Sequence, residues 1–201
     1  DLTPDQRDKW RLYLSRRFRL HLDDVTPETW KRANGWKFPS LVWTSLDAGL
    51  RPVEVSRFTT NWLNLDNQRL LIPKEDSSKN KDNWIVPISE RTTTALEKWM
   101  EQRELYEKYE GEDHLWLTRE ENPYGNSSLR YVMGRLFDVA EIPKENRTVS
   151  WYSIRHSTGT YMTREEDLKA AQSQLRHKSP MTTMQYDQAP EGDRRDALDK
   201  M

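Results

Sequence analysis

The chain has 201 residues, enough for one domain with its own hydrophobic core, and we expect a single domain over residues 1–201. It contains no cysteine, which excludes disulfides and thiolate metal sites, and its four histidines lack the clustering of a zinc site. No apolar run approaches the roughly 20 residues that cross a bilayer, and the N-terminal residues do not form a signal peptide. We therefore expect a cytoplasmic protein without a metal, a cofactor or a membrane partner.

The net charge is −1, although proteins that bind nucleic acids usually carry a basic surplus. The charges are unevenly placed: residues 7–19 hold six basic side chains and one acidic, whereas residues 97–121 hold four basic and nine acidic ones. Such a chain can turn a basic face to DNA. The acidic stretch is equally compatible with an ordinary solvated helix face.

Helix signals dominate the first quarter of the chain. Capping residues predict helices over about residues 3–20 and 26–35, the second of which ends at an Asn-Gly pair. Apolar residues at helical spacing predict a third helix over residues 38–46, and Gly49 ends it. Arg51-Pro52 then begins another helix, because proline suits the first helical position.

Shorter apolar runs follow, with turn residues between them. They predict three antiparallel strands at residues 62–65, 69–73 and 84–88, the last two joined by a polar, lysine-rich segment. Ser89 is expected to cap a helix to about residue 109, and another helix is expected over residues 126–140.

The last part of the chain is again helical. Thr148 or Ser150 is expected to cap a helix that carries Arg155, and a further helix is expected over about residues 163–177. A short segment from Ser179-Pro180 would then present Tyr186. The predicted fold class is α+β, mainly helical, with one small three-stranded antiparallel sheet.

Four short motifs stand out in chain order. In residues 46–55, a helix end and a glycine turn precede Arg51 in an Arg-Pro-x-Glu sequence. Lys79 stands eight residues before the proline of a Val-Pro pair, and residues 152–156 read aromatic-x-x-Arg-His. Finally, His177 stands nine residues before a tyrosine, with a Thr-Thr pair between them.

Together these motifs resemble the active-site core of the tyrosine recombinase (phage integrase) family, over roughly residues 1–190. The resemblance implies the catalytic domain of a site-specific recombinase or integrase, which cleaves and rejoins DNA through a 3′-phosphotyrosine without a metal. The implied partner is double-stranded DNA with a specific recombination site, on which the protein would form a dimer to tetramer. The family's N-terminal DNA-clamping domain is expected to be absent from this chain.

The resemblance also implies roles for individual residues. Arg51 and Arg155 would offset charge on the phosphate, because a guanidinium is always protonated and donates two parallel hydrogen bonds. Tyr186 would attack the phosphorus, and His177 would donate to a phosphate oxygen. An ordinary salt bridge to Glu54 is the structural alternative for Arg51, and a helix-dipole contact is the alternative for His177.

Two further positions complete the implied site. Lys79 would be the general acid, with Lys81 in reserve, although a lysine on a polar hairpin is ordinarily just solvated. Tyr152 stands where the family usually has a histidine, and we expect it to donate a hydrogen bond to the phosphate because a phenol is a poor base at pH 7. His156 is expected to be structural.

Two other functions remain compatible with these residues. A type IB topoisomerase uses similar catalytic residues, although the compact segment from His177 to Tyr186 favours a recombinase. A helical DNA-binding module without activity is the second alternative, which Tyr152 and the missing clamp domain make plausible.

Overall fold

The computed structural model describes residues 35–74, 83–139 and 150–184, so the two predicted helices before residue 35 lie outside the described residues, apart from Gly35. The helices are α3 (Lys37–Ala48), α4 (Pro52–Arg57), α5 (Glu90–Arg103), α6 (Asn126–Val139), α7 (Tyr152–Glu165), α8 (Leu168–Leu175) and α9 (Pro180–Thr183). The strands are β1 (Leu63–Asn64), β2 (Arg69–Pro73) and β3 (Asn83–Pro87). The predicted mainly helical α+β fold is confirmed.

The three strands form one antiparallel sheet in the order β1-β2-β3. Leu70 on the central strand lies opposite Leu63 on one side and Val86 on the other. Leu70, Ile72 and Val86 are buried, whereas Ile85 on the edge strand is exposed, as the two-residue period of a strand requires. The sheet therefore has one face in the core.

The junction between α3 and α4 follows the predicted signals. Gly49 ends α3 with a φ of 56°, and a Cβ at this position would overlap the side chain of Leu175. Glycine is therefore required both by its left-handed conformation and by the close approach of α8. Arg51 then forms the N-cap of α4, and Pro52 occupies the first turn.

Three predicted helix boundaries were wrong. Helix α5 ends at Arg103 instead of residue 109, because the Arg103 guanidinium donates to the carbonyls of Glu112 and His114 in the returning chain. Helix α7 has Trp151 as its N-cap, without a side-chain cap from Ser150. Helix α8 begins after residue 167, whose carboxylate accepts a hydrogen bond of 2.6 Å from the Ala170 N–H, instead of at residue 163.

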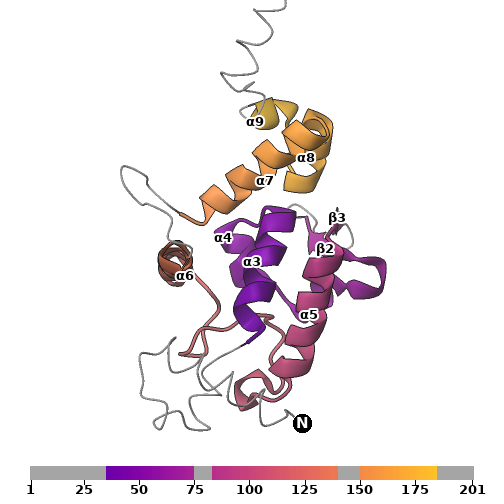
Figure 1. Ribbon diagram of the computed structural model, residues 1–201. Coiled ribbons are helices and arrows are strands. Elements are labelled where there is room, and N and C mark those ends of the chain that lie inside the picture. The colour runs from indigo at the N-terminus through magenta and orange to yellow at the C-terminus, as the bar shows by residue number, and fades with distance from the viewer. Residues whose placement is uncertain (1–34, 75–82, 140–149, 185–201) are drawn as a thin grey trace, which may run out of the picture.

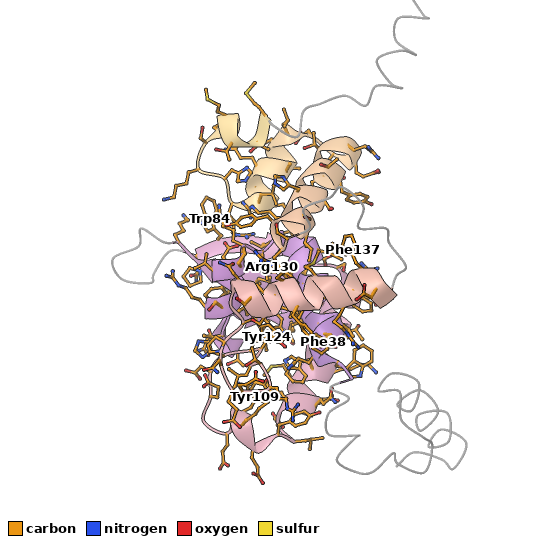
Figure 2. The ribbon with its side chains drawn as sticks, turned by 90° about the vertical axis from the view of Figure 1, so that its left-hand side faces the viewer. Phe38, Trp84, Tyr109, Tyr124, Arg130 and Phe137 are labelled. Carbon is orange, nitrogen blue, oxygen red and sulfur yellow. The ribbon has the colours of Figure 1, made fainter. Side chains whose placement is uncertain are left out.

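Most of the core lies between α3, α5 and the chain that follows α5. Trp99 of α5 is fully buried and donates from its indole Nε1 to the Leu115 carbonyl at 2.9 Å. Trp116 is also buried, donates to Ser40 Oγ at 3.0 Å and packs on the ring of Phe58. Figure 2 shows α6 crossing one face of the molecule.

Helices α7, α8 and α9 form a second group, at the top of Figure 1, beside the α3–α4 junction. The short segment predicted to start at Ser179-Pro180 forms α9, and Ser179 Oγ accepts from the Met181 N–H. Within the described ranges, no helix has both the length and the apolar character needed to cross a membrane.

Candidate active site

A cavity of about 620 Å³ lies where α4, the ends of β2 and β3, and the turn from α8 to α9 meet. Five of its lining residues are cationic, namely Arg51, Arg57, Lys74, Arg176 and Lys178. One is a carboxylate, Glu54, and His177 and the rings of Trp62 and Trp84 also line it. Because the whole chain has a net charge of −1, the cavity concentrates positive charge that the chain as a whole lacks.

Arg51 reaches this cavity from the N-terminus of α4. Its backbone N–H donates to Glu54 Oε2 at 2.7 Å, and its Nη1 lies 3.3 Å from Glu54 Oε1. The side chain keeps 30% of its surface exposed, so its guanidinium faces the cavity while its backbone is held by the helix start. The salt bridge expected as the alternative to a catalytic role is therefore present, and it leaves that role open.

Arg176 is the residue of this site that the sequence analysis missed. It caps α8 at a φ of 57°, and its side chain is buried. Its Nε donates to Glu54 Oε1 at 3.0 Å and its Nη2 to Glu54 Oε2 at 2.7 Å, a bidentate pair. Its Nη1 donates to the carbonyls of Ala48 and Gln174 at 2.7 and 2.8 Å. No local pattern marks such a residue, because all these contacts except that to Gln174 join distant segments.

The Glu54 carboxylate is shared by both arginines. Burial acts to raise the pKa of Glu54, but the charge and hydrogen bonds of Arg176, helped by Arg51, outweigh burial and hold this pKa below its ordinary value. Glu54 is therefore ionised at neutral pH.

His177 follows Arg176 and is buried in the cavity wall. Its Nδ1 lies 2.8 Å from the hydroxyl oxygen of Thr183. Its pKa is lowered to about 4 by burial and by three neighbouring guanidinium groups, those of Arg155, Arg51 and Arg176. The ring is therefore neutral at pH 7, and the tautomer that accepts from the Thr183 hydroxyl would carry its proton on Nε2 as a donor.

Arg155 lies behind these residues and does not line the cavity. It is buried, and its Nη1 and Nη2 donate to the carbonyls of Gly49 and Leu175 at 2.6 and 2.5 Å. These two bonds tie α7 to the turn after α3 and to the end of α8. Tyr152 is about half exposed at the first turn of α7, and it does not line the cavity either.

The structure thus brings Arg51 and His177 together and places Arg155 close enough for its charge to act on the His177 ring. The predicted residues Lys79, Lys81 and Tyr186 lie outside the described residues. Lys74, at the end of β2, lines the cavity with its Nζ 5.0 Å from the Trp84 ring centroid. Over the described ranges, no group of three or more His, Asp or Glu side chains is arranged to hold a metal ion.

Comparison with known proteins agrees with this arrangement. The family described as the phage integrase family matches residues 37–191, which include the α3–α4 junction and the α8–α9 turn. The chain belongs to the phage integrase family. Its members are tyrosine recombinases, enzymes that cleave and rejoin DNA strands, and the fold is that of their catalytic domain.

Three relatives are distantly similar to this chain. Tyrosine recombinase XerC of Treponema denticola is 28% identical over an alignment of 120 positions that covers 54% of this chain and 38% of that protein. Among solved structures, XerA recombinase has a TM-score of 0.65 at 16% identity, covering 99% of this chain and 62% of that one. XerH bound to a palindromic difH substrate has a TM-score of 0.68 at 18% identity, covering 98% and 52%. The chain thus spans less than two thirds of these proteins.

Proposed function

We propose that this chain is the catalytic domain of a site-specific DNA recombinase or integrase that cleaves DNA through a 3′-phosphotyrosine. The observation that carries the proposal is the cationic cavity in which Arg51 and a neutral His177 meet. A phosphodiester is an anion that a guanidinium binds with two parallel hydrogen bonds, so the cavity has the charge and the donors that a scissile phosphate requires. The family to which the chain belongs cleaves and rejoins DNA strands, which supports the proposal.

In the proposed reaction Tyr186 gives up its phenol proton to solvent or to the phosphate environment, its oxygen attacks the phosphorus, and the bond from phosphorus to the 5′-oxygen breaks. Arg51 stabilises the negative charge that develops on the non-bridging oxygens, and His177 donates to one of them from Nε2. Lys79 gives the proton that the leaving 5′-oxygen takes up, and Lys81 is the reserve for this role. Reversal of the same steps by a new 5′-hydroxyl rejoins the strand.

Arg155 and Tyr152 complete the proposed site from α7. Arg155 already donates to two backbone carbonyls, so its contribution combines positive charge at the phosphate with the anchoring of the Gly49 turn and of α8. Tyr152 is assigned a hydrogen bond to the phosphate, and it has the exposure needed to reach DNA on the surface.

The proposed substrate is double-stranded DNA with a specific recombination site, on which two to four copies of the chain assemble. Solved structures with this fold include the Tn1549 transposon integrase in complex with a circular intermediate DNA and a lambda integrase dimer bound to a core site. Those observations concern these proteins and support the assignment to this chain by their shared fold.

The test uses a nicked suicide substrate that traps a covalent protein–DNA adduct, separated on a denaturing gel. Tyr186→Phe should bind DNA and form no adduct, because it removes only the attacking oxygen. Tyr161→Phe is the matched control, since Tyr161 is 64% exposed on α7 and away from the cavity. Adduct formation by Tyr186→Phe at the rate of the wild type would contradict the assignment.

A further inference from the structure

Arg51 and Arg176 both contact the buried carboxylate of Glu54, and the contacts of Arg176 are shorter and more numerous. The Arg176 contacts with Glu54 are 2.7 and 3.0 Å, and they involve both oxygens. The side-chain contact from Arg51 is 3.3 Å and involves one oxygen. The shorter, bidentate pair is the stronger one, so most of the Glu54 charge is taken up by Arg176.

The exposure of the two side chains follows the same division. The Arg176 side chain is 1% exposed, whereas that of Arg51 is 30% exposed toward the cavity. If Glu54 had Arg51 as its only cationic partner, the buried carboxylate would draw the Arg51 guanidinium into a bidentate pair of its own. That guanidinium would then have fewer donors for an incoming phosphate.

We propose that Arg176 is a positioning residue for DNA cleavage: by pairing with Glu54, it leaves the Arg51 guanidinium available to the scissile phosphate. This inference rests on the proposed function of the cavity. Arg176 acts through Arg51 and not on the phosphate itself: although it lines the cavity, its side chain is 1% exposed and its nitrogens already donate to Glu54 and to backbone carbonyls.

The backbone conformation of Arg176 also indicates that its side chain has a specific role. Its φ of 57° lies in the left-handed region, which glycine adopts without strain and an arginine does not. The side chain stabilises this conformation through five hydrogen bonds, two to Glu54 and three to the carbonyls of Ala48, Gly49 and Gln174. The same residue thereby fixes the chain immediately before His177.

Four proteins test the proposal: the wild-type chain, Glu54→Gln, Arg176→Met and the double variant. Methionine at position 176 removes the charge and keeps a side chain at the same φ, so the backbone strain stays the same. Each protein is measured for its melting temperature, its DNA affinity and its rate of adduct formation on saturating DNA.

Arg176→Met should slow adduct formation by about 30-fold, which is less than the loss of a preorganised donor itself. The double variant should return to within about fivefold of the wild-type rate, because a neutral glutamine no longer pulls Arg51 inward. Its melting temperature should stay below that of the wild-type protein, since the carbonyls of Ala48 and Gln174 still lack the Arg176 donor. Recovery of the rate without recovery of stability is an outcome that a purely structural residue would not give.

Arg103→Met is the matched control, because Arg103 is also buried and donates to two backbone carbonyls away from the cavity. It should lower the melting temperature and leave the rate of the folded protein unchanged. A double variant as slow as Arg176→Met, or an Arg176→Met rate equal to the wild-type rate, would overturn the proposal. If Arg176→Met does not fold, Arg176→Gln replaces it with the same expectations.

A second readout separates this inference from the proposed function. Inorganic phosphate is titrated into the same four proteins and followed through the histidine ring resonances by NMR. Arg176→Met should weaken phosphate binding by about tenfold and the double variant should recover it, because Arg51 is a phosphate donor with or without cleavage. Equal phosphate affinities in all four proteins contradict the role of Arg176. If Arg176→Met binds phosphate more weakly and the double variant recovers, but no protein forms an adduct, only the proposed cleavage activity is contradicted.

Discussion

Two buried cations in this protein are accommodated in opposite ways. Lys37, at the start of α3, donates from Nζ to the Leu117 carbonyl at 2.8 Å and lies 5.2 and 5.4 Å from the ring centroids of Phe38 and Tyr124. Burial, followed by the charge of Lys108, lowers its pKa to about 7. Arg176 lies near the C-terminus of α3, where it contacts the Ala48 carbonyl. It is as buried as Lys37, but it forms a bidentate pair with Glu54.

The difference follows from the chemistry of the two side chains. A lysine in an apolar site can lose its proton, so the core around Trp99 and Trp116 tolerates Lys37 with a carbonyl and two rings for partners. An arginine stays protonated, so its buried guanidinium needs fixed acceptors, and Arg176 finds them in the Glu54 carboxylate and in backbone carbonyls. Lys37, at the structural end of the molecule, can therefore become neutral. Arg176, at the cavity, stays charged and must be held by fixed partners.

The largest expected effect comes from removing a guanidinium at the cavity. Arg51→Lys should slow adduct formation by about 10²-fold or more, because an ammonium cannot give two parallel hydrogen bonds to the phosphate. The melting temperature should change little, since the Arg51 side chain is partly exposed and its backbone contact with Glu54 remains. The rate is measured on the suicide substrate with saturating DNA.

Lys37→Met is the control for Arg51→Lys, because it changes a buried cation at the structural end of the molecule. It should leave the rate of adduct formation at pH 7 unchanged, because Lys37 does not line the cavity. If Lys37→Met slowed cleavage as much as Arg51→Lys, the proposed division between a structural and a functional end would be wrong.

The pH dependence of stability should distinguish the two cations. The folded pKa of Lys37 is about 7 and lies below its unfolded value, so the unfolded chain binds the proton more strongly and stability rises as the pH increases from about 7 toward 10.5. Relative to Lys37→Met, the wild-type free energy of unfolding should rise on the order of 2 kcal/mol between pH 7 and 9. Urea unfolding at each pH measures it, and parallel curves for the two proteins would contradict the lowered pKa.

Signals confined to a few neighbouring residues predicted much of this fold. Gly49 and Pro52 defined the α3–α4 junction, and Ser89 and Ser179 marked their helix starts, because each acts on backbone groups within one turn. The start of α8 was missed although residue 167 is a cap of the same kind, since the uninterrupted helical pattern before it concealed the break.

The site was predicted less completely, and for a different reason. Arg51 and His177 lie together as their motifs indicated. The sequence did not reveal that Arg155 donates to the carbonyls of Gly49 and Leu175, or that Arg176 pairs with Glu54. These contacts join residues that are 20, 106 and 122 positions apart, so no local pattern marks them.

Like Lys37, His177 is a buried group that can lose its proton, but it lies in the cavity wall. Its folded pKa of about 4 lies below its unfolded value, so the unfolded chain binds the proton more strongly between pH 4 and about 6.5. Relative to His177→Gln, the wild-type protein should gain stability over this range and none above it. The gain should be smaller than that of Lys37, because the pKa is displaced less. A histidine resonance at position 177 that titrates near pH 6.5 would contradict this prediction.

The smallest expected effect is at Tyr152, whose ring is 49% exposed at the start of α7 and outside the cavity wall. A phenol with a reference pKa of about 10 is not a useful base at pH 7, but it can donate a hydrogen bond to the phosphate. Tyr152→Phe should therefore lower the rate of adduct formation only several-fold, and Tyr152→His should restore or raise it near neutral pH. His156→Ala is the control, because this exposed histidine is expected to be structural. If Tyr152→Phe leaves the rate unchanged while His156→Ala removes it, the two roles are reversed.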